Sequence, residues 1–143
     1  MVRAFTAALF FLAVAAFLPL QAQSVAIIVH PETEIVSLTK AELSQIFLKR
    51  VAHWDDRRDA FPVDQVPSSP VRREFTRWIH NRRDVVIIEV YWKRMIFSGR
   101  GVPPPEMADD DAVIAYVRST PGAVGYVAKS ARTEGVRVLK VVD

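Results

Sequence analysis

The fold of this chain is decided by the segment VAIIVHPETEIVSLTKAELSQIF, residues 25–47. Its first five residues are an unbroken apolar run, mostly β-branched, which is typical of a strand buried on both faces. His30-Pro31 ends that strand, because proline forces its predecessor into an extended conformation and cannot donate to a sheet ladder. Thr39 with Glu42 three residues later is a capping box, and it predicts a helix that ends near Leu48.

Strands and helices continue to alternate beyond this segment. We predict a short strand at 60–63, helices that open at Ser69-Pro70 and at Asp109–Asp111, and strands at 123–127 and 136–141. Ser69 is a suitable N-cap, and proline is tolerated at the first helical position. This alternation predicts one α/β domain, with a mixed, mostly parallel sheet flanked by helices.

Residues 84–97 carry two conflicting signals. Their first part, Val85–Ile88, favours a strand by propensity. Ile88, Trp92, Met95 and Ile96 instead keep helical spacing, and Gly99 suits the end of a helix. We predict a helix here.

The N-terminus has the order of a secretory signal peptide. Arg3 precedes an apolar run over residues 4–20, and the small residue Ala22 suits the position before a cleavage site. The run is at the lower limit for crossing a bilayer, so a retained membrane anchor is the alternative. We therefore expect a leader on residues 1–22 and a periplasmic domain on residues 23–143.

Composition excludes several classes of function. The 19 Lys and Arg against 16 Asp and Glu give a net charge of +3, of which Arg3 belongs to the leader. So small a charge does not indicate nucleic acid or an anionic membrane as the main partner. The chain has no cysteine, hence no disulfide or thiol chemistry, and its histidines (His30, His53 and His80) lack metal-ligand spacing. No catalytic triad or nucleotide loop is present, so we expect neither an enzyme nor a cofactor.

Several strings, taken in order, resemble the phosphate-type solute-binding proteins of bacterial ABC importers, which have the periplasmic binding protein type II fold. The strings are residues 25–30 running into 38–48, Trp54-Asp55, Ser69 with Phe75, Phe97–Gly101, and Thr120–Val127. Together they cover nearly all of the chain after residue 22. The resemblance implies an exported substrate-binding component, or an accessory, of an ABC phosphate transporter.

Two features depart from that family. Its members have two lobes that close on the ligand, whereas residues 23–143 suffice for one lobe. The family also places an arginine at the start of its phosphate-binding loop and Ser-Gly-Thr at the helix opening. The matching positions here are Gln65 and Ser69-Pro70-Val71, so the serine alone is kept.

The candidate anion site is the N-terminus of the helix that begins at Pro70. Unpaired N–H groups and the positive end of the helix dipole attract anions there, and Ser68 and Ser69 add hydroxyl donors. Arg72 opposes the dipole unless an anion neutralises it, so we expect it to replace the missing family arginine. The ligand-binding residues that we predict are Gln65, Ser68, Ser69, Arg72 and, from the resemblance, Arg100.

Two alternatives stay open. Asp64 or Glu74 would neutralise Arg72 without any ligand, and Ser-Pro would then be ordinary helix capping. The chain would in that case be a ligand-free protein-interaction module, docking on an envelope protein or membrane sensor through the face that a second lobe covers in the family. An exposed apolar patch would favour that function. A homodimer would be another way to rebuild a two-lobed cleft.

Overall fold

The computed structural model describes residues 24–143, and the leader expected on residues 1–22 lies outside them. The strands are β1 (Val25–Val29), β2 (Ser37–Thr39), β3 (Phe61–Pro62), β4 (Asp64–Gln65), β5 (Glu106–Met107), β6 (Ala123–Ala128) and β7 (Arg137–Val142). The helices are α1 (Lys40–Phe47), α2 (Pro70–Ile79), α3 (Val85–Phe97) and α4 (Asp110–Ser119). Within the described residues, no helix is long and apolar enough to cross a bilayer.

The sheet is mixed, as the sequence predicted. Its strand order is β2-β7-β1-β6-β3, with β1 antiparallel to both β6 and β7. The outer ladders, β2 with β7 and β3 with β6, are parallel. A separate parallel pair joins β4 to β5. In residues 24–143, three of the five strand ladders are therefore parallel, but the two at the centre of the sheet are antiparallel.

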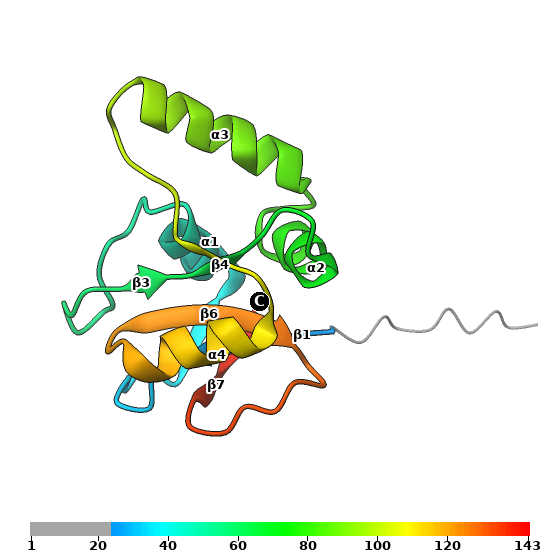
Figure 1. The fold of residues 1–143 in the computed structure, drawn as a ribbon. Helices are drawn as coiled ribbons and strands as arrows, with labels where there is room; N and C mark the ends of the chain where they lie inside the picture. The colour runs from blue at the N-terminus through cyan, green and yellow to red at the C-terminus, as the bar shows by residue number, and fades with distance from the viewer. Residues whose placement is uncertain (1–23) are drawn as a thin grey trace, which may run out of the picture.

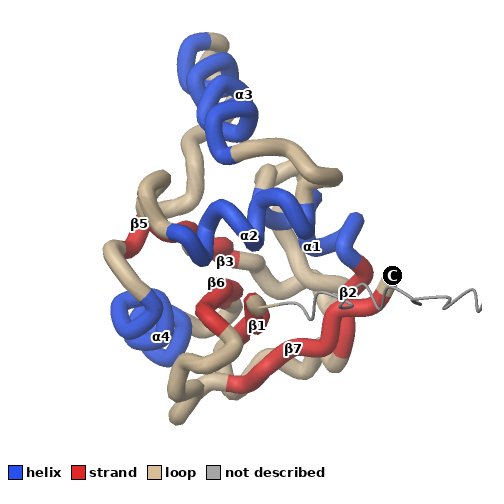
Figure 2. The backbone as a smooth tube through the Cα atoms, turned by 90° about the vertical axis from the view of Figure 1, so that its right-hand side faces the viewer, coloured by secondary structure: helices blue, strands red, loops and turns tan. Residues whose placement is uncertain are grey.

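Helices cover both faces of this sheet (Figures 1 and 2). Val25, Ile27 and Val29 of β1 pack in one cluster with α1 and α2, while Ile28 packs in another with α4. This alternation follows from the two-residue period of a strand. The predicted strand is therefore buried on both faces.

The predicted helix boundaries agree with the structure. Thr39 caps α1 with the expected capping box, and Ser69 and Asp109 cap α2 and α4. Residues 85–97 form a helix, so burial of one helical face prevailed over β propensity. Of the four residues whose spacing predicted it, Ile88 and Trp92 are buried and Met95 is half-buried, but Ile96 is exposed.

Two glycines explain the string at residues 120–127. Gly122 has a φ of +85°, and a Cβ there would lie 2.3 Å from the carbonyl oxygen of Asp59. A Cβ on Gly125 would lie 2.6 Å from Val113 of α4. The first glycine permits the tight turn into β6, and the second permits α4 to pack directly on that strand.

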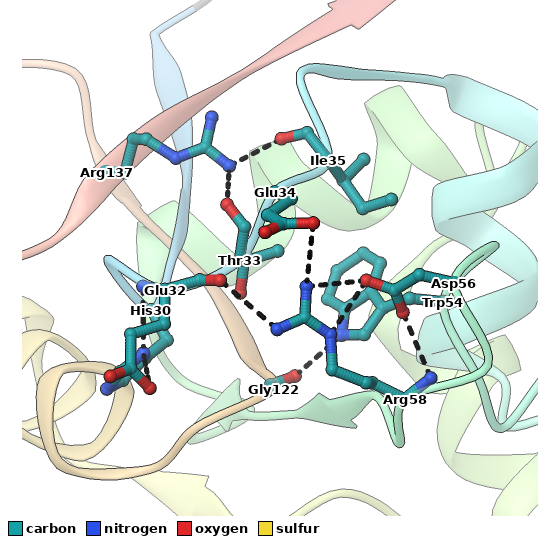
Figure 3. Close-up of polar contacts among 10 residues, drawn as sticks. All are labelled: His30, Glu32, Thr33, Glu34, Ile35, Trp54, Asp56, Arg58, Gly122 and Arg137. Carbon is teal, nitrogen blue, oxygen red and sulfur yellow. Dashed lines mark hydrogen bonds and ion pairs between the residues drawn. The ribbon is translucent and has the colours of Figure 1, made fainter.

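Arginines fasten the loop that connects β1 to β2 (Figure 3). Arg137 donates to the carbonyl oxygens of Thr33 and Ile35. Arg58 pairs with Asp56 at 2.6 Å and with Glu34 at 3.6 Å. Close by, the buried indole of Trp54 donates to the carbonyl oxygen of Gly122 at 3.1 Å. Two strings that carry the family resemblance thus bond to each other.

Candidate functional site

The N-terminus of α2 is built around the Ser69 hydroxyl. It accepts from the backbone N–H of Arg72 at 3.2 Å and donates to Oε1 of Gln65 at 2.7 Å. Pro70 occupies the first helical position, where a missing N–H costs nothing. The Ser69 hydroxyl thus has protein partners for both donor and acceptor functions, which leaves it one free lone pair.

Gln65 ties this helix start to the rest of the domain. Its buried side-chain amide donates to the carbonyl oxygen of Tyr126 at 3.1 Å and to Asp110 Oδ1 at 2.8 Å. Asp110 Oδ2 accepts from the backbone N–H of Ala128 at 3.1 Å. The side chain of Gln65 therefore joins α2, β6 and α4.

Arg72 lies inside the domain instead of on its surface. Its side chain is buried, and Nη1 donates to the carbonyl oxygen of Gln65 at 2.7 Å and to Glu106 at 2.9 Å. Its Nε lies 3.4 Å from Asp64 Oδ1. Two carboxylates thus accompany the cation that opposes the α2 dipole, and one of them, Asp64, is a neutralising partner that the sequence suggested.

Asp64 is the most buried acid of this network. Burial raises the pKa of its carboxyl above the usual range, and the Arg72 guanidinium opposes that shift. The Tyr126 hydroxyl donates to the same carboxyl, and burial, followed by the charge of Asp64, raises the pKa of Tyr126. Tyr126 also stacks on Phe75 with ring centroids 3.8 Å apart. The arginine network is thus part of the domain core.

An open hollow of about 630 Å³ lies outside this network, between the N-termini of α2 and α4. Both helices start here because β4 and β5 are parallel neighbours, so their carboxyl ends meet at one edge. The lining residues come from the two helix starts and from the loop after β6: Gln65, Val66, Ser68, Ser69, Pro70, Val71, Ala108, Asp109, Asp110, Asp111, Ala131 and Arg132.

The hollow offers both donors and acceptors. In residues 24–143, no protein acceptor bonds the N–H groups of Ser68 and Val71 or the hydroxyl of Ser68. The acids Asp109, Asp110 and Asp111 also line the hollow, and Arg132 is the cation of the lining. Asp109 caps α4 and Asp110 accepts from Gln65 and from the backbone of Ala128, so Asp111 is the acid that accepts from no protein donor within the described residues. The site therefore suits a small molecule that both accepts and donates hydrogen bonds.

The structure brings together three of the five predicted site residues. Gln65, Ser68 and Ser69 line the hollow, whereas Arg72 lies behind it and Arg100 lies beyond the end of α3. A ligand role for each of the five stays a prediction. Within the described residues, no group of three or more His, Cys, Asp or Glu is arranged to hold a metal ion.

Sequence reasoning missed the acids and Arg132 of this hollow. It assigned Asp109–Asp111 to helix capping, which is correct, since Asp109 Oδ1 accepts from the N–H of Ala112 at 2.9 Å. Strand pairing is the signal that would have included these residues in the predicted site. Two short segments, at 64–65 and 106–107, each precede a helix start, and pairing them in parallel places both helix starts side by side.

Solved structures of phosphate-binding proteins share this architecture. An ABC-type phosphate transport receptor from Vibrio cholerae superposes with a TM-score of 0.66 at 15% identity, over 84% of this chain and 47% of its own. A protein from Clostridium perfringens, provisionally described as a phosphate ABC transporter substrate-binding protein and solved with bound phosphate, gives 0.61 at 16% identity, over 82% and 44%. PstS from Borrelia burgdorferi gives 0.57 at 16%, over 82% and 47%.

The chain shares the fold of part of each of these proteins. At these identities the likeness shows the fold alone, and the chain spans less than half the length of each of these proteins. No protein-family model matches the sequence, and neither does any curated protein. The fold that the resemblance implied is thus confirmed, while membership of the phosphate-binding family is not established by sequence.

Proposed function

We propose that this chain is an exported binding module for a small protonated oxyanion, with phosphate the best match. The observation that carries the proposal is the hollow between the starts of α2 and α4, which is lined by free backbone N–H groups and by acidic residues. The N-termini of helices favour anions through their unpaired N–H groups and dipoles. The shared fold with phosphate-binding proteins supports the same ligand class.

The acids of the hollow select among oxyanions. Phosphate near neutral pH keeps at least one proton, so it is able to donate to a carboxylate such as Asp111 while accepting from Ser68 and the N–H of Val71. Sulfate has no proton to donate and would be repelled by the three carboxylates. In this arrangement Arg72 holds the carbonyl of Gln65 and so fixes the loop, without touching the anion.

Binding by this module should be weak. The hollow is open to solvent and cannot enclose a ligand as pockets usually do. Function as the capturing component or an accessory of a phosphate importer then requires a further surface that closes over the hollow. A second copy of the chain or a transporter component would supply it.

Thermal unfolding of residues 23–143 in phosphate, sulfate and chloride at equal ionic strength tests the proposal. A ligand at about 100 times its Kd adds about 2.7 kcal/mol, which raises Tm by several degrees. We expect this rise in phosphate, a smaller one in sulfate, and none for Ser68→Asp, which places a like charge at the donors. Ser37→Asp, on edge strand β2, is the matched control and should keep the response. Equal Tm values in all three salts would contradict the proposal.

A ligand-free interaction module is the second candidate, and one observation favours it. The exposed large apolar side chains of the domain are concentrated on α3 and the residue stretch after it: Val86, Ile87, Val90, Ile96, Phe97 and Val102. This is the exposed patch that such a module needs. A flat response to every oxyanion would support this candidate.

A further inference from the structure

Helix α3 is apolar on two opposite sides. Its inner side packs through Ile88 and Trp92 on Leu48, in a small cluster separate from the two main ones. At about 100° per residue, Val86, Val90 and Phe97 fall together on the opposite side of the helix. Phe97 is 94% exposed and Val86 67%. An outward apolar stripe of this kind contributes nothing to the core.

Two cations of α3 border this outward stripe, and three more lie next to the helix in the sequence. Lys93 and Arg94 flank it along the helix, Arg82 and Arg83 precede the helix, and Arg100 follows it. Within the described residues, none of these five cations forms an ion pair. Asp84, at the start of the helix, is already paired with Arg77 at 3.0 Å. Glu89 is the remaining acid of α3.

The position of α3 leaves the stripe free. The helix stands at one end of the molecule, and α1 and α2 separate it from the sheet (Figures 1 and 2). The contacts of α3 with other elements are mainly with α2. The helix can therefore lie flat against a planar surface without disturbing the sheet or the hollow.

We propose that α3 docks on an anionic lipid bilayer, with its axis parallel to the membrane plane. Helices that lie in a membrane interface combine a stripe of Phe and aliphatic residues with flanking Lys and Arg. Phe97, Val90 and Val86 would enter the boundary between headgroups and acyl chains. Lys93 and Arg94 would reach lipid phosphates, and a cation near an anionic surface strengthens binding about fivefold.

The spacing of the stripe favours lipid over a protein groove. A helix that binds in a protein groove inserts apolar side chains at positions i, i+4 and i+7. Counted from Val86, position i+7 is Lys93, which is charged. In a protein groove that ammonium group would be buried without a partner. At a bilayer the Lys93 stem follows the apolar surface, and its charge reaches the headgroups.

Charge also disfavours a second copy of this chain as the occupant. Two α3 helices that pack through their outward stripes would bring Lys93 and Arg94 of each copy close together. Glu89 is the unpaired acid available on each helix to offset those charges. An anionic surface offsets Lys93 and Arg94 together, so these two cations beside the stripe are what identify the partner. The net charge of the whole chain conceals them.

Co-sedimentation of residues 23–143 with lipid vesicles tests the proposal, since every described helix and strand and the core lie within this range. We expect binding to equimolar phosphatidylglycerol and phosphatidylcholine, weakening with salt, and little binding to phosphatidylcholine alone. Phe97→Ser should weaken binding about tenfold or more. Lys93→Glu should weaken it by at least about fivefold. Neither change touches the hollow, so the phosphate response should persist.

Matched controls lie on the body of the domain. Val36→Ser removes an equally exposed valine and compares with Val86→Ser, while Lys140→Glu reverses an exposed cation on β7 and compares with Lys93→Glu. Both controls should bind vesicles as the unchanged chain does. Equal binding to neutral vesicles, or α3 variants that bind normally, would overturn the proposal. So would a dimer in sedimentation that Phe97→Ser disrupts while vesicles bind nothing.

Discussion

Arg72 on α2 and the cations around α3 are the same kind of group in opposite surroundings. The Arg72 side chain is buried among two carboxylates and a backbone carbonyl. Lys93 and Arg94 of α3 are exposed, and neither forms an ion pair within the described residues. We infer that the charge of Arg72 stabilises the fold, whereas the charges of Lys93 and Arg94 serve the proposed binding to lipid. Substitutions should therefore separate the two regions by what they damage.

The largest effect on stability is expected from Arg72→Met. It leaves Asp64 buried without its cation, and breaking a buried pair in this way costs about 3–5 kcal/mol. Without Arg72 the raised pKa of Asp64 rises further, so the folded variant binds a proton that the unfolded chain releases. The stability of the variant should then improve as pH falls from 7 towards 5. Urea denaturation at both pH values measures this.

The matched control for that change is Arg77→Met on the same helix. Arg77 pairs with Asp84 at 3.0 Å, but both side chains are more than half exposed. Exposed pairs contribute at most about 1 kcal/mol. Equal losses for Arg72→Met and Arg77→Met would mean that burial does not distinguish the two arginines.

His80 gives a smaller, pH-dependent test of the buried region. Its side chain is buried, Nδ1 lies 2.8 Å from the Ser44 hydroxyl, and burial, aided by the charges of Arg83 and Arg50, lowers its pKa from 6.5 to about 4. Below pH 6.5 the unfolded chain takes up a proton that the folded chain does not. Stability is thus fully present above pH 6.5 and should fall by about 3 kcal/mol as pH drops to 4.

Chemical denaturation across that pH range, compared between the unchanged chain and His80→Asn, isolates this contribution. The variant has no imidazole to titrate, so the gap between the two curves should change by about 3 kcal/mol between pH 7 and pH 4. Parallel curves over the whole range would show that His80 is protonated as readily in the folded domain as in the unfolded chain.

The smallest effect on stability is expected on the outward side of α3. Val86→Ser and Phe97→Ser change side chains that are mostly exposed, so unfolding free energies should change by about 0.5 kcal/mol or less. Ile88→Ala, on the inner side of the same helix, should cost about 2–5 kcal/mol. A large loss from Phe97→Ser would place its ring in the core and remove the distinction between the two sides.

Local signals in the sequence predicted most of the helices and strands. The capping box at Thr39, the Ser69-Pro70 helix start and the helical spacing of Ile88 and Trp92 each act within one turn or one face. The contacts that decide the site join distant segments and leave no local pattern. Glu106 bonds to Arg72 although 34 residues separate them in the sequence, and Asp110 bonds to Gln65 across 45 residues. The sequence predicted Arg72 as a ligand contact, with Asp64 as an alternative partner, and no local pattern indicated Glu106.

The outward stripe of α3 escaped prediction for a different reason. An apolar residue at helical spacing is ordinarily part of the core, and nothing local distinguishes Ile88, which is buried, from Phe97, which is not. The direction of each side depends on where α2 and Leu48 lie. The net charge of the chain gave no sign of this face either, since it averages Lys93 and Arg94 with acids elsewhere on the chain.

The place of β1 at the centre of the sheet sets the timing of folding. Among the described strands β1 comes earliest in the chain, yet it pairs residue 25 with residue 128 of β6 and residue 27 with residue 139 of β7. Pairings so distant in sequence close slowly. During synthesis the apolar run Val25–Val29 therefore stays unpaired until β6 and β7, near the end of the described residues, have been made. That delay keeps the nascent chain open, which suits a protein expected to leave the cytoplasm before it folds.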